Sequence, residues 1–413
     1  MRYVVIYILF LLAGAQVKAQ ENVVPLNHNP QLIGFHSDAL RSVMRTNAPD
    51  SLTLPFFEDF TGQFPQPDLN KWADWHVFIN NTMAIDPISR GVATFDALNK
   101  DGWPYNTTNA FALIYADSLT SLRFNLSGYA PSDNIYLSFF YQPQGAGFSP
   151  EAQDSLMLYF LTRHKGWQKV WSKEGTTVQP FKQVVVAVTD TGFLHENFQF
   201  RFVNKASINL NDDVWNVDYI RMNSNRNAND TMVNDVAFTK EPTPFLKEYT
   251  YMPYHQYLPK ANDERATEMK TSLYNSYNAP QPVTYTLTAR EESTNTPLST
   301  SSNSISLPNG IQNEIAVPTY ANSVPLTERY KWVSFENKYT FDAVNALEPK
   351  TNDTIIQHQV FHNFFAYDDG IAERSYYLNQ FSTLPAKTAI EFHLNKPDTA
   401  YGCIDIFWPP GTY

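Results

Sequence analysis

Cysteine is almost absent from this chain, since Cys403 is the one cysteine among 413 residues. A single thiol cannot form an internal disulfide, so the fold must be stabilised by its hydrophobic cores and, where a site exists, by bound metal. Cys403 stands beside the apolar run Ile404–Trp408. Its expected role is therefore that of a small buried hydrophobic residue.

Positive charge is also scarce. Lys and Arg number 30 against 41 Asp and Glu, which leaves a formal net charge of −11, and charged residues make up 17% of the chain. No cluster of Lys and Arg is found along it. Because phosphate binding needs a basic face, this composition excludes a nucleic-acid partner. The chain also has no Gly-x-Ser-x-Gly, no His-Glu-x-x-His and no Gly-rich phosphate loop, so no catalytic motif of these classes is present.

Long apolar runs are missing after the first residues. Arg2, the apolar run Val4–Ala15 and the small-residue pattern Val17–Ala19 together form an export signal, with cleavage expected after Ala19. An uncleaved N-terminal anchor is the alternative, although the run is short for a bilayer-spanning helix. No Cys stands directly after the run, so a lipid anchor is not supported. We therefore expect an exported protein without a transmembrane segment after cleavage, in the periplasm, at the outer membrane or cell surface, or outside the cell.

Aromatic residues, by contrast, are abundant, with 24 Tyr and 29 Phe. They recur in short runs, of which Phe198–Phe202 is the clearest. In it phenylalanines alternate with polar residues, which is the period of a strand with one solvated face. Ala110–Tyr115 and Ile135–Tyr141 are further runs, of the buried type, and turn-rich stretches separate them. Many short strands at about ten-residue spacing predict an all-β protein built of sandwiches.

Breaks in this pattern divide most of the chain into two domains. Residues 20–53 are polar and form a linker or lead-in strand after the signal. Residues 54–224 have the length of a jelly roll. A polar break over 223–234 separates them from residues 235–362, where fewer strands suggest an immunoglobulin-like sandwich.

Residues 363–413 begin a third β pattern, with strands expected at 389–394 and 404–408. Two strands cannot close a sandwich or hide their edges. We therefore expect an incomplete third β domain that continues beyond Tyr413. The alternative is that these strands dock on the second sandwich, as terminal strands can.

Two short motifs mark the first and last strands of the first sandwich. Phe56–Phe60 (FFEDF) and Trp215–Ile220 (WNVDYI) each place carboxylates among strand-forming aromatics. If these strands are neighbours, Glu58 or Asp59 lies close to Asp218, and a buried carboxylate needs a counter-charge. Calcium prefers carboxylate oxygens brought together from different strands. The sequence thus predicts a structural calcium site of these three residues, with a salt bridge to an arginine as the alternative.

The stretch Phe365–Glu373 (FAYDDGIAE) resembles a signature that recurs in large exported proteins of Bacteroidota associated with type IX secretion and gliding motility. Ile371 stands where that signature has Thr, and Arg374–Leu378 replaces its usual Gly-rich continuation. Residues 54–224 are similar to the MAM/concanavalin-like jelly rolls of the same proteins. The resemblance implies that calcium in this jelly roll is structural and that a further jelly roll follows the signature. The C-terminal sorting domain of secretion clients is not found in this sequence.

Candidate ligand-binding residues are Trp72, Trp75 and Trp103, which stand in polar, loop-like stretches. Exposed rings of this kind often bind sugars or peptides; packing inside or between domains is the alternative. Glycanase chemistry in the first sandwich would need two carboxylates across one cleft. The acidic residues available for it are Glu151, Asp154, Glu174 and Glu196.

These observations together favour a non-enzymatic role. We expect an exported binding or adhesion protein, or an extracytoplasmic part of the secretion and gliding apparatus, whose partner is a protein or a glycan of the cell envelope. The alternative is a non-catalytic accessory region of a secreted protease or glycoside hydrolase. A glycanase active in the first sandwich itself is a third hypothesis.

Overall fold

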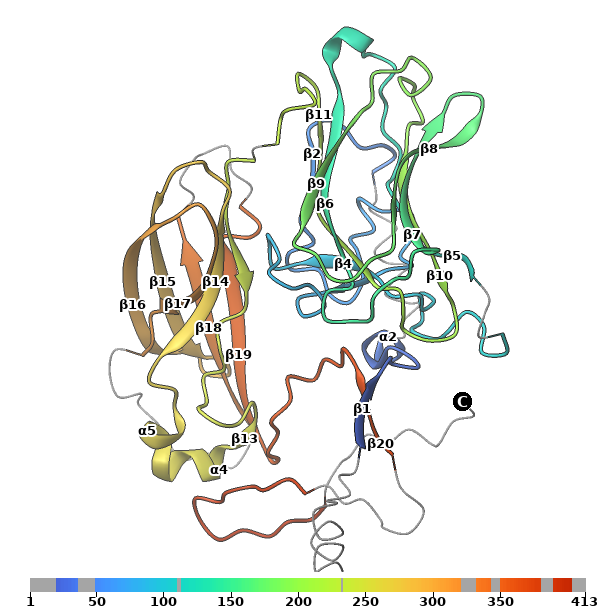
Figure 1. The fold of residues 1–413 in the computed structure, drawn as a ribbon. Coiled ribbons are helices and arrows are strands. Elements are labelled where there is room, and N and C mark those ends of the chain that lie inside the picture. Colours follow the sequence, from blue (N-terminus) through green and yellow to red (C-terminus); the bar gives the residue numbers. More distant parts are fainter. Residues whose placement is uncertain are drawn as a thin grey trace, which may run out of the picture.

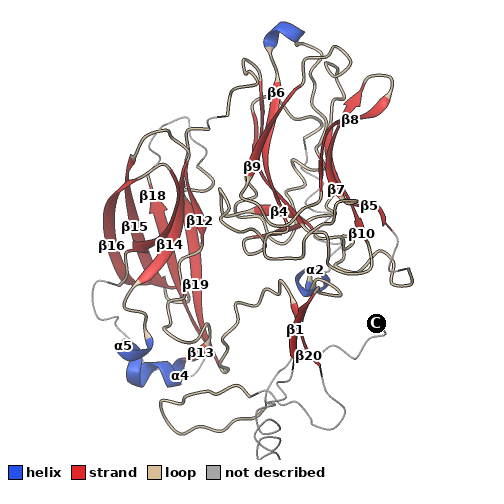
Figure 2. Ribbon diagram, in the orientation of Figure 1, coloured by secondary structure: helices blue, strands red, loops and turns tan. Residues whose placement is uncertain are grey.

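The structure, a computed structural model, describes residues 20–35, 49–109, 113–231, 233–320, 332–342, 350–379 and 389–402. The described chain is almost entirely β: two sandwiches lie side by side, with a two-stranded ribbon beside the first of them (Figures 1 and 2). The predicted all-β class is therefore confirmed. The predicted signal peptide, Cys403 and the strand predicted at 404–408 lie outside the described residues. No helix in the described part of the chain is long and apolar enough to cross a membrane.

The first sandwich consists of two antiparallel sheets. One sheet has the strand order β5-β10-β7-β8, and the other has the order β3-β4-β11-β6-β9 with β2 also paired to β11. The elements are β2 (Phe56–Glu58), β3 (Phe78–Asn80), β4 (Val92–Phe95), β5 (Leu113–Thr120), η1 (Pro131–Asp133), β6 (Tyr136–Pro143), β7 (Ser155–Thr162), β8 (Gly166–Glu174), β9 (Lys182–Ala187), β10 (Phe200–Ser207) and β11 (Trp215–Asn223). Glu58 of β2 lies opposite Ile220 of β11. The prediction that the two carboxylate-bearing motifs form neighbouring strands is thus confirmed.

Alternating phenylalanines build the core of this sandwich. Phe200 and Phe202 of β10 are fully buried, whereas Arg201 between them is only partly buried on the outer face of the sheet. Phe202 packs edge-to-face against Phe139 of β6, which belongs to the opposite sheet, with 4.8 Å between ring centroids. Burial of a ring of this size contributes about 2–3 kcal/mol. The phenylalanines that alternate with polar residues in the sequence therefore pack the two sheets against each other.

The second sandwich has sheets with the strand orders β12-β14-β17 and β13-β19-β18-β15-β16. Its strands are β12 (Val236–Lys240), β13 (Met252–Pro253), β14 (Met269–Asn275), β15 (Gln281–Glu291), β16 (Thr296–Leu307), β17 (Gly310–Val317), β18 (Val333–Phe341) and β19 (Thr354–His362). The short helices α4 (Tyr254–Tyr257), η2 (Leu258–Lys260) and α5 (Ala261–Glu264) cover one end. Membership of the immunoglobulin-like class stays a prediction.

The polar stretch 301–306 is part of the long strand β16. Its residues pair with β15 throughout. The hydroxyls of Thr284 and Ser304 lie 2.8 Å apart across the pair, and those of Thr286 and Ser302 lie 2.9 Å apart. Such cross-strand hydroxyl pairs stabilise a strand whose outer face is solvated.

The lead-in residues contain both a strand and a helix. β1 (Gln20–Val24) pairs antiparallel with β20 (Ser375–Asn379) to form the ribbon. The helix α2 (Pro30–Gly34) follows, and its N-cap Asn29 accepts hydrogen bonds from the backbone N–H groups of Gln31 and Leu32 at 3.0 and 3.3 Å. Such a cap satisfies donors that the first helical turn leaves unpaired. Residues 20–53 were expected to form a linker or a lead-in strand. A strand is observed at the start of this range.

The signature-like stretch connects the second sandwich back to the first. Ala366 at its start exchanges backbone hydrogen bonds with Tyr251 of the second sandwich. Ile371 packs on a small apolar cluster that includes Val214 of the first sandwich. Arg374 donates to the Gly147 carbonyl at 3.1 Å, and its guanidinium lies 5.4 Å from the ring centroid of Phe148. We call Ile371–Arg374 the return segment.

The strand predicted at 389–394 is not formed, and this prediction was wrong. Residues 389–402 are irregular and lie on the second sandwich. The His393 N–H donates to the Tyr249 hydroxyl at 2.7 Å, and the Asn395 N–H donates to the Gln256 side-chain oxygen at 2.9 Å. The backbone N–H groups of this segment are thus bonded to side chains of the second sandwich, whereas in a strand they would be bonded to the backbone of a neighbouring strand. The alternative of docking on the second sandwich is thus observed for this segment, although not as a strand.

Candidate functional sites on the first sandwich

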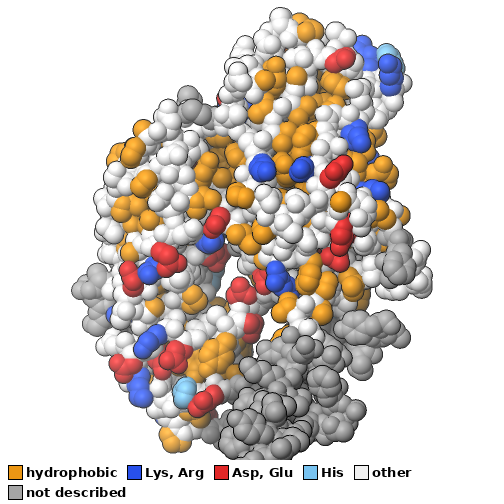
Figure 3. All heavy atoms as spheres, viewed as in Figure 1, with side chains coloured by type: hydrophobic (Ala, Val, Ile, Leu, Met, Phe, Trp, Pro, Cys, Tyr) orange, Lys and Arg blue, Asp and Glu red, His pale blue; other side chains and the backbone are white. Residues whose placement is uncertain are grey.

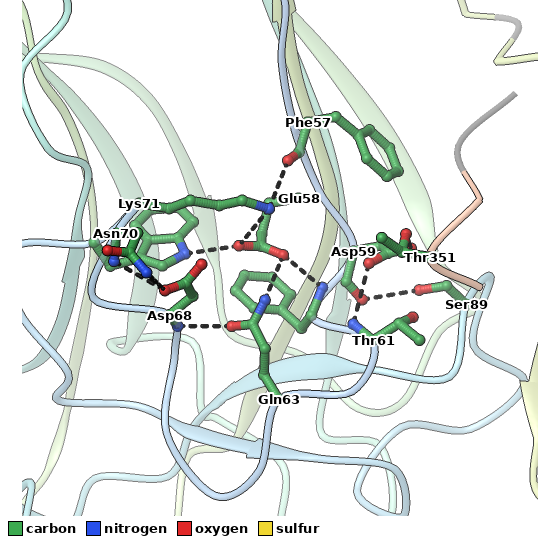
Figure 4. A network of polar contacts seen from close by, with 12 residues as sticks. Phe57, Glu58, Asp59, Thr61, Gln63, Asp68, Asn70, Lys71, Ser89 and Thr351 are labelled. Atoms are coloured by element: carbon green, nitrogen blue, oxygen red, sulfur yellow. Dashed lines mark hydrogen bonds and ion pairs between the residues drawn. The ribbon is translucent and has the colours of Figure 1, made fainter. Parts of the chain in front are cut away.

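Glu58, the first predicted metal ligand, is buried among hydrogen-bond donors of its own domain (Figure 4). Its Oε1 accepts from the Phe60 N–H at 3.0 Å and from the Gln63 side chain at 2.8 Å. Its Oε2 accepts from the Trp72 indole N–H at 3.1 Å and lies 3.4 Å from the Lys71 ammonium. Burial raises the pKa of Glu58, and the Lys71 charge opposes that rise. Both oxygens of this carboxylate are therefore already engaged.

Asp218, the second predicted ligand, is fully buried in β11. The Ser89 hydroxyl lies 3.0 and 3.1 Å from its two oxygens, and the Ser89 N–H donates at 3.3 Å. The Tyr219 N–H donates a further bond at 2.5 Å. Burial raises the pKa of Asp218 well above its ordinary value, and the nearby charge of Asp59 raises it further. Backbone and hydroxyl donors thus surround this carboxyl group where a cation was expected.

Asp59, the third predicted ligand, faces the second sandwich. Its Oδ1 accepts from the Thr61 N–H at 3.1 Å, and its Oδ2 accepts from the Thr351 hydroxyl at 2.8 Å. Arg90 adds a favourable electrostatic interaction with Asp59. The predicted alternative of an arginine partner therefore has a counterpart in Arg90.

Among the described residues these three carboxylates do not gather into one group within 4.8 Å. Glu58 points to Lys71 and accepts from the Trp72 indole, whereas Asp59 is contacted by Thr351 from the second sandwich (Figure 4). Asp59 and Asp218 do lie close to each other, since the Ser89 hydroxyl contacts the Asp59 carbonyl and the Asp218 carboxyl group, and the Asp59 charge raises the pKa of Asp218. Calcium at this place stays a prediction. Hydrogen-bond donors of the protein contact each of the three buried carboxylates.

The three predicted ligand-binding tryptophans have different environments. Trp72 is only 1% exposed, so the expectation of an exposed ring was wrong for it. It lies in the core because its indole N–H can reach Glu58. Trp75 is partly buried. Trp103 is 47% exposed, as expected, and stacks on the buried His28 with 5.1 Å between ring centroids.

An aromatic surface that the sequence reasoning missed lies on the outer side of the sheet β5-β10-β7-β8. Tyr115 is 64% exposed, contrary to the buried run expected there. Tyr159 of β7 interacts with the Tyr115 hydroxyl, and burial raises the pKa of Tyr159. The guanidinium of Arg201 lies 4.1 Å from the ring centroid of Trp167. We call Tyr115, Tyr159, Trp167 and Arg201 the aromatic face. Tyr159 and Arg201 each stand between buried apolar residues of their strands, and this alternation was the signal that could have found it.

The acidic residues considered for glycanase chemistry do not form one cleft. Glu151 and Asp154 lie at the start of β7, where the Gly175 N–H after β8 donates to the Asp154 carbonyl at 3.0 Å. Glu196 is near the other end of β7, because its neighbour His195 is hydrogen-bonded to the Leu161 carbonyl at 3.0 Å. Asp213, which the sequence reasoning did not consider, lies instead beside Glu151 and Asp154.

Comparison with known proteins identifies no close relative. No family model and no curated protein matches the chain. A β-glucuronidase from Parabacteroides merdae is 12% identical, with a TM-score of 0.29 over 72% of this chain and 36% of that one. The Endo-D glycoside hydrolase domain from Streptococcus pneumoniae is 9% identical, with a TM-score of 0.26 over 75% and 43%. A β-D-mannosidase from Dictyoglomus thermophilum is 8% identical, with a TM-score of 0.26 over 59% and 29%.

The chain therefore spans less than half the length of these three enzymes. Likeness at this level carries no argument about the activity of the chain. What the molecule does has to be inferred from its own surfaces.

Proposed function

We propose that this chain is an exported, non-enzymatic binding protein of the cell envelope that holds a glycan or a protein on the aromatic face. Support for export comes from the N-terminal signal. The type IX secretion and gliding context is supported by the resemblance of residues 365–373. The observation that carries the binding role is the aromatic face itself.

The chemistry of the aromatic face suits a ligand with alternating apolar and polar patches. Rings of Tyr and Trp present apolar area together with a hydrogen-bonding edge, and they sit on strands that need no ordering upon binding. Arg201 is held in place by its contact with Trp167 and by a 2.7 Å hydrogen bond to the Thr120 hydroxyl. Sugar rings and extended peptides both fit such a surface.

Positive charge borders the aromatic face. Lys169 lies opposite Tyr159 and Lys205 lies opposite Tyr115 in the strand registers, next to Arg201 itself. On the side of the molecule shown in Figure 3, Lys and Arg are scattered over both sandwiches. A glycan or peptide segment that is neutral or carries negative charge is therefore the expected partner.

The test is adhesion of beads that carry the protein to bacterial cells. We expect wild-type beads to bind and beads with Trp167→Ala or Tyr115→Ala to bind at least about tenfold less, since each lost ring contact is worth around 1.4 kcal/mol or more. Trp332→Ala is the matched control, because Trp332 is 59% exposed but lies on the second sandwich.

Treatment of the cells identifies the partner class. Loss of binding after periodate oxidation would indicate a glycan, and loss after protease treatment would indicate a protein. Equal adhesion of wild type, Trp167→Ala and Tyr115→Ala would refute the proposal, as would equal losses in Trp167→Ala and Trp332→Ala.

A further inference from the structure

Three carboxylates meet at one end of the first sandwich. One side-chain oxygen from each of Glu151, Asp154 and Asp213 lies within 4.8 Å of the corresponding oxygens of the other two residues. Glu151 and Asp154 precede β7 of the four-stranded sheet, whereas Asp213 precedes β11 of the opposite sheet. This acidic triad therefore bridges the two sheets.

Both aspartates of the acidic triad have one oxygen bound and one oxygen unpartnered. Asp154 Oδ2 accepts from the Glu151 N–H at 2.8 Å, and Asp213 Oδ2 accepts from the Ser207 N–H at 2.7 Å. Both side chains are fully buried, and within the described residues neither Oδ1 has a hydrogen-bond partner. A buried carboxylate oxygen without a donor is costly. The geometry therefore calls for a positive group between the two aspartates.

The protein supplies no such positive group among its described residues. No lysine, arginine or histidine there forms an ion pair with Glu151, Asp154 or Asp213; the Lys205 ammonium nearby contacts the Gln153 carbonyl at 3.4 Å instead. Asp212 adds a further carboxylate, whose pKa is raised by burial and by the Glu151 charge. Negative charge thus accumulates without compensation.

The titration of the acidic triad agrees with its geometry. Burial raises the pKa of Asp154 to about 6 and that of Asp213 to about 8, and neighbouring carboxylates contribute to both rises. Metal binding displaces protons from carboxyl groups, so a bound cation and a retained proton can be told apart by their pH dependence.

We propose that Glu151, Asp154 and Asp213 bind a divalent cation of the calcium class, which fixes the surface that receives the return segment. Carboxylate oxygens without thiol or imidazole ligands select a hard cation. The remaining positions around it belong to water and backbone oxygens. Glu151 is exposed, which gives the ion access from solvent.

The link to the return segment follows from the neighbours of the acidic triad in the chain. Asp213 adjoins Val214, a member of the apolar cluster against which Ile371 packs, and the Val214 N–H donates to the Phe148 carbonyl at 3.1 Å. The Arg374 guanidinium in turn lies over the ring of Phe148. A cation that joins Asp213 to Glu151 therefore fixes the loops on both sides of this surface. Its removal should loosen the docking of the return segment.

The experiment uses the whole secreted chain at pH 8, stripped with EDTA and then titrated with calcium chloride in a calorimeter. We expect one saturable binding event and a rise in melting temperature of roughly 5–10 °C at about a hundredfold excess over Kd. Asp213→Asn and Asp154→Asn should lose both. Glu174→Gln, at the same end of the sheet, should keep both.

Two further measurements keep the proposal falsifiable if a variant is altered in stability. Metal-free Asp213→Asn should melt at or above metal-free wild type, because it removes an uncompensated buried charge. Hydrogen exchange should slow on calcium addition in peptides covering 144–154 and 365–379 in wild type, but not in Asp213→Asn.

Three results would overturn the proposal. The first is the absence of calcium-dependent heat and melting shift at pH 8, which would leave a protonated carboxyl cluster. The second is a calcium response retained in Asp213→Asn and lost in Asp218→Asn, which would place the ion at the joint between the sandwiches. The third is an equal response to calcium and magnesium in wild type and all variants, which would indicate an adventitious ion only.

Discussion

The Tyr219 hydroxyl of the first sandwich donates a hydrogen bond to the Asp235 carboxylate at the entrance to the second. The Asn352 side chain donates to the same carboxylate at 2.9 Å. Tyr219 immediately follows Asp218, one of the residues predicted to bind calcium, so the polar joint between the sandwiches adjoins that predicted site. Asp59 extends the joint through its bond to Thr351. Buried polar networks of this kind favour one relative orientation, because any other leaves donors and acceptors unpaired.

Removal of the Tyr219 hydroxyl tests this joint. Tyr219→Phe should lower the free energy of unfolding by about 1.5–3 kcal/mol, the range for a hydrogen bond to a charged group. Urea denaturation measures the loss, and small-angle scattering should show a broader distribution of domain orientations. Tyr401→Phe is the control, because Tyr401 is 97% exposed. Unchanged stability and scattering in Tyr219→Phe would mean that the joint is held by its other contacts.

Trp72 provides a test of the buried network around Glu58. Trp72→Phe should cost roughly 2–4 kcal/mol, because it leaves space in the core and removes the donor to Glu58 Oε2. Trp332→Phe, a substitution of an exposed tryptophan, should change stability by less than about 0.5 kcal/mol. Guanidinium denaturation compares the two. Equal effects would contradict the assignment of Trp72 to the core.

The acidic triad predicts how stability depends on pH in the chelated protein. The pKa values of Asp154 and Asp213 are raised in the folded state to about 6 and about 8, so above the ordinary carboxyl pKa near 4 the folded protein binds more protons than the unfolded chain. The free energy of unfolding should therefore fall as pH rises from about 4 to about 8.

Calcium and Asp213→Asn should both flatten the dependence of the unfolding free energy on pH. Calcium replaces the bound protons, and Asp213→Asn removes the titrating group. Thermal denaturation across the pH range measures this dependence. Other buried carboxyl groups, such as Asp96, whose pKa burial raises to about 7, contribute a background that remains in Asp213→Asn. Identical pH profiles of the chelated wild type and Asp213→Asn would show that Asp213 does not titrate in this range.

The return segment can be tested independently of any metal. Arg374→Ala removes the hydrogen bonds to the carbonyls of Ala146 and Gly147 and the contact with the Phe148 ring. These contacts together are worth about 1–3 kcal/mol of local stability. We expect limited proteolysis to cut near 365–379 at least about fivefold faster, with the melting temperature of the sandwiches nearly unchanged. Lys396→Ala removes an exposed positive charge elsewhere and should not alter the cleavage rate.

The sequence by itself determined the class of the fold and the pairing of its marker strands. The alternation of Phe200 and Phe202 with Arg201 predicted a strand with one buried face, which the structure confirms. The two carboxylate-bearing motifs predicted β2 and β11 as neighbours, and they pair. The alternation depends on residues one or two positions apart, which face opposite sides of any strand. The neighbourhood of β2 and β11 is not local, and it was expected from the resemblance to jelly rolls.

Only the tertiary structure decided which polar groups share a site. Trp72 stands in a polar stretch yet is buried, because Glu58 of another segment accepts its N–H. Asp154 and Asp213 lie far apart in the chain yet share the acidic triad, because β7 and β11 belong to opposite sheets that pack face to face. The physical reason is that two loops meet only where the sheets pack together and where the chain crosses from one sheet to the other. No local pattern of residues encodes the distance between two such loops.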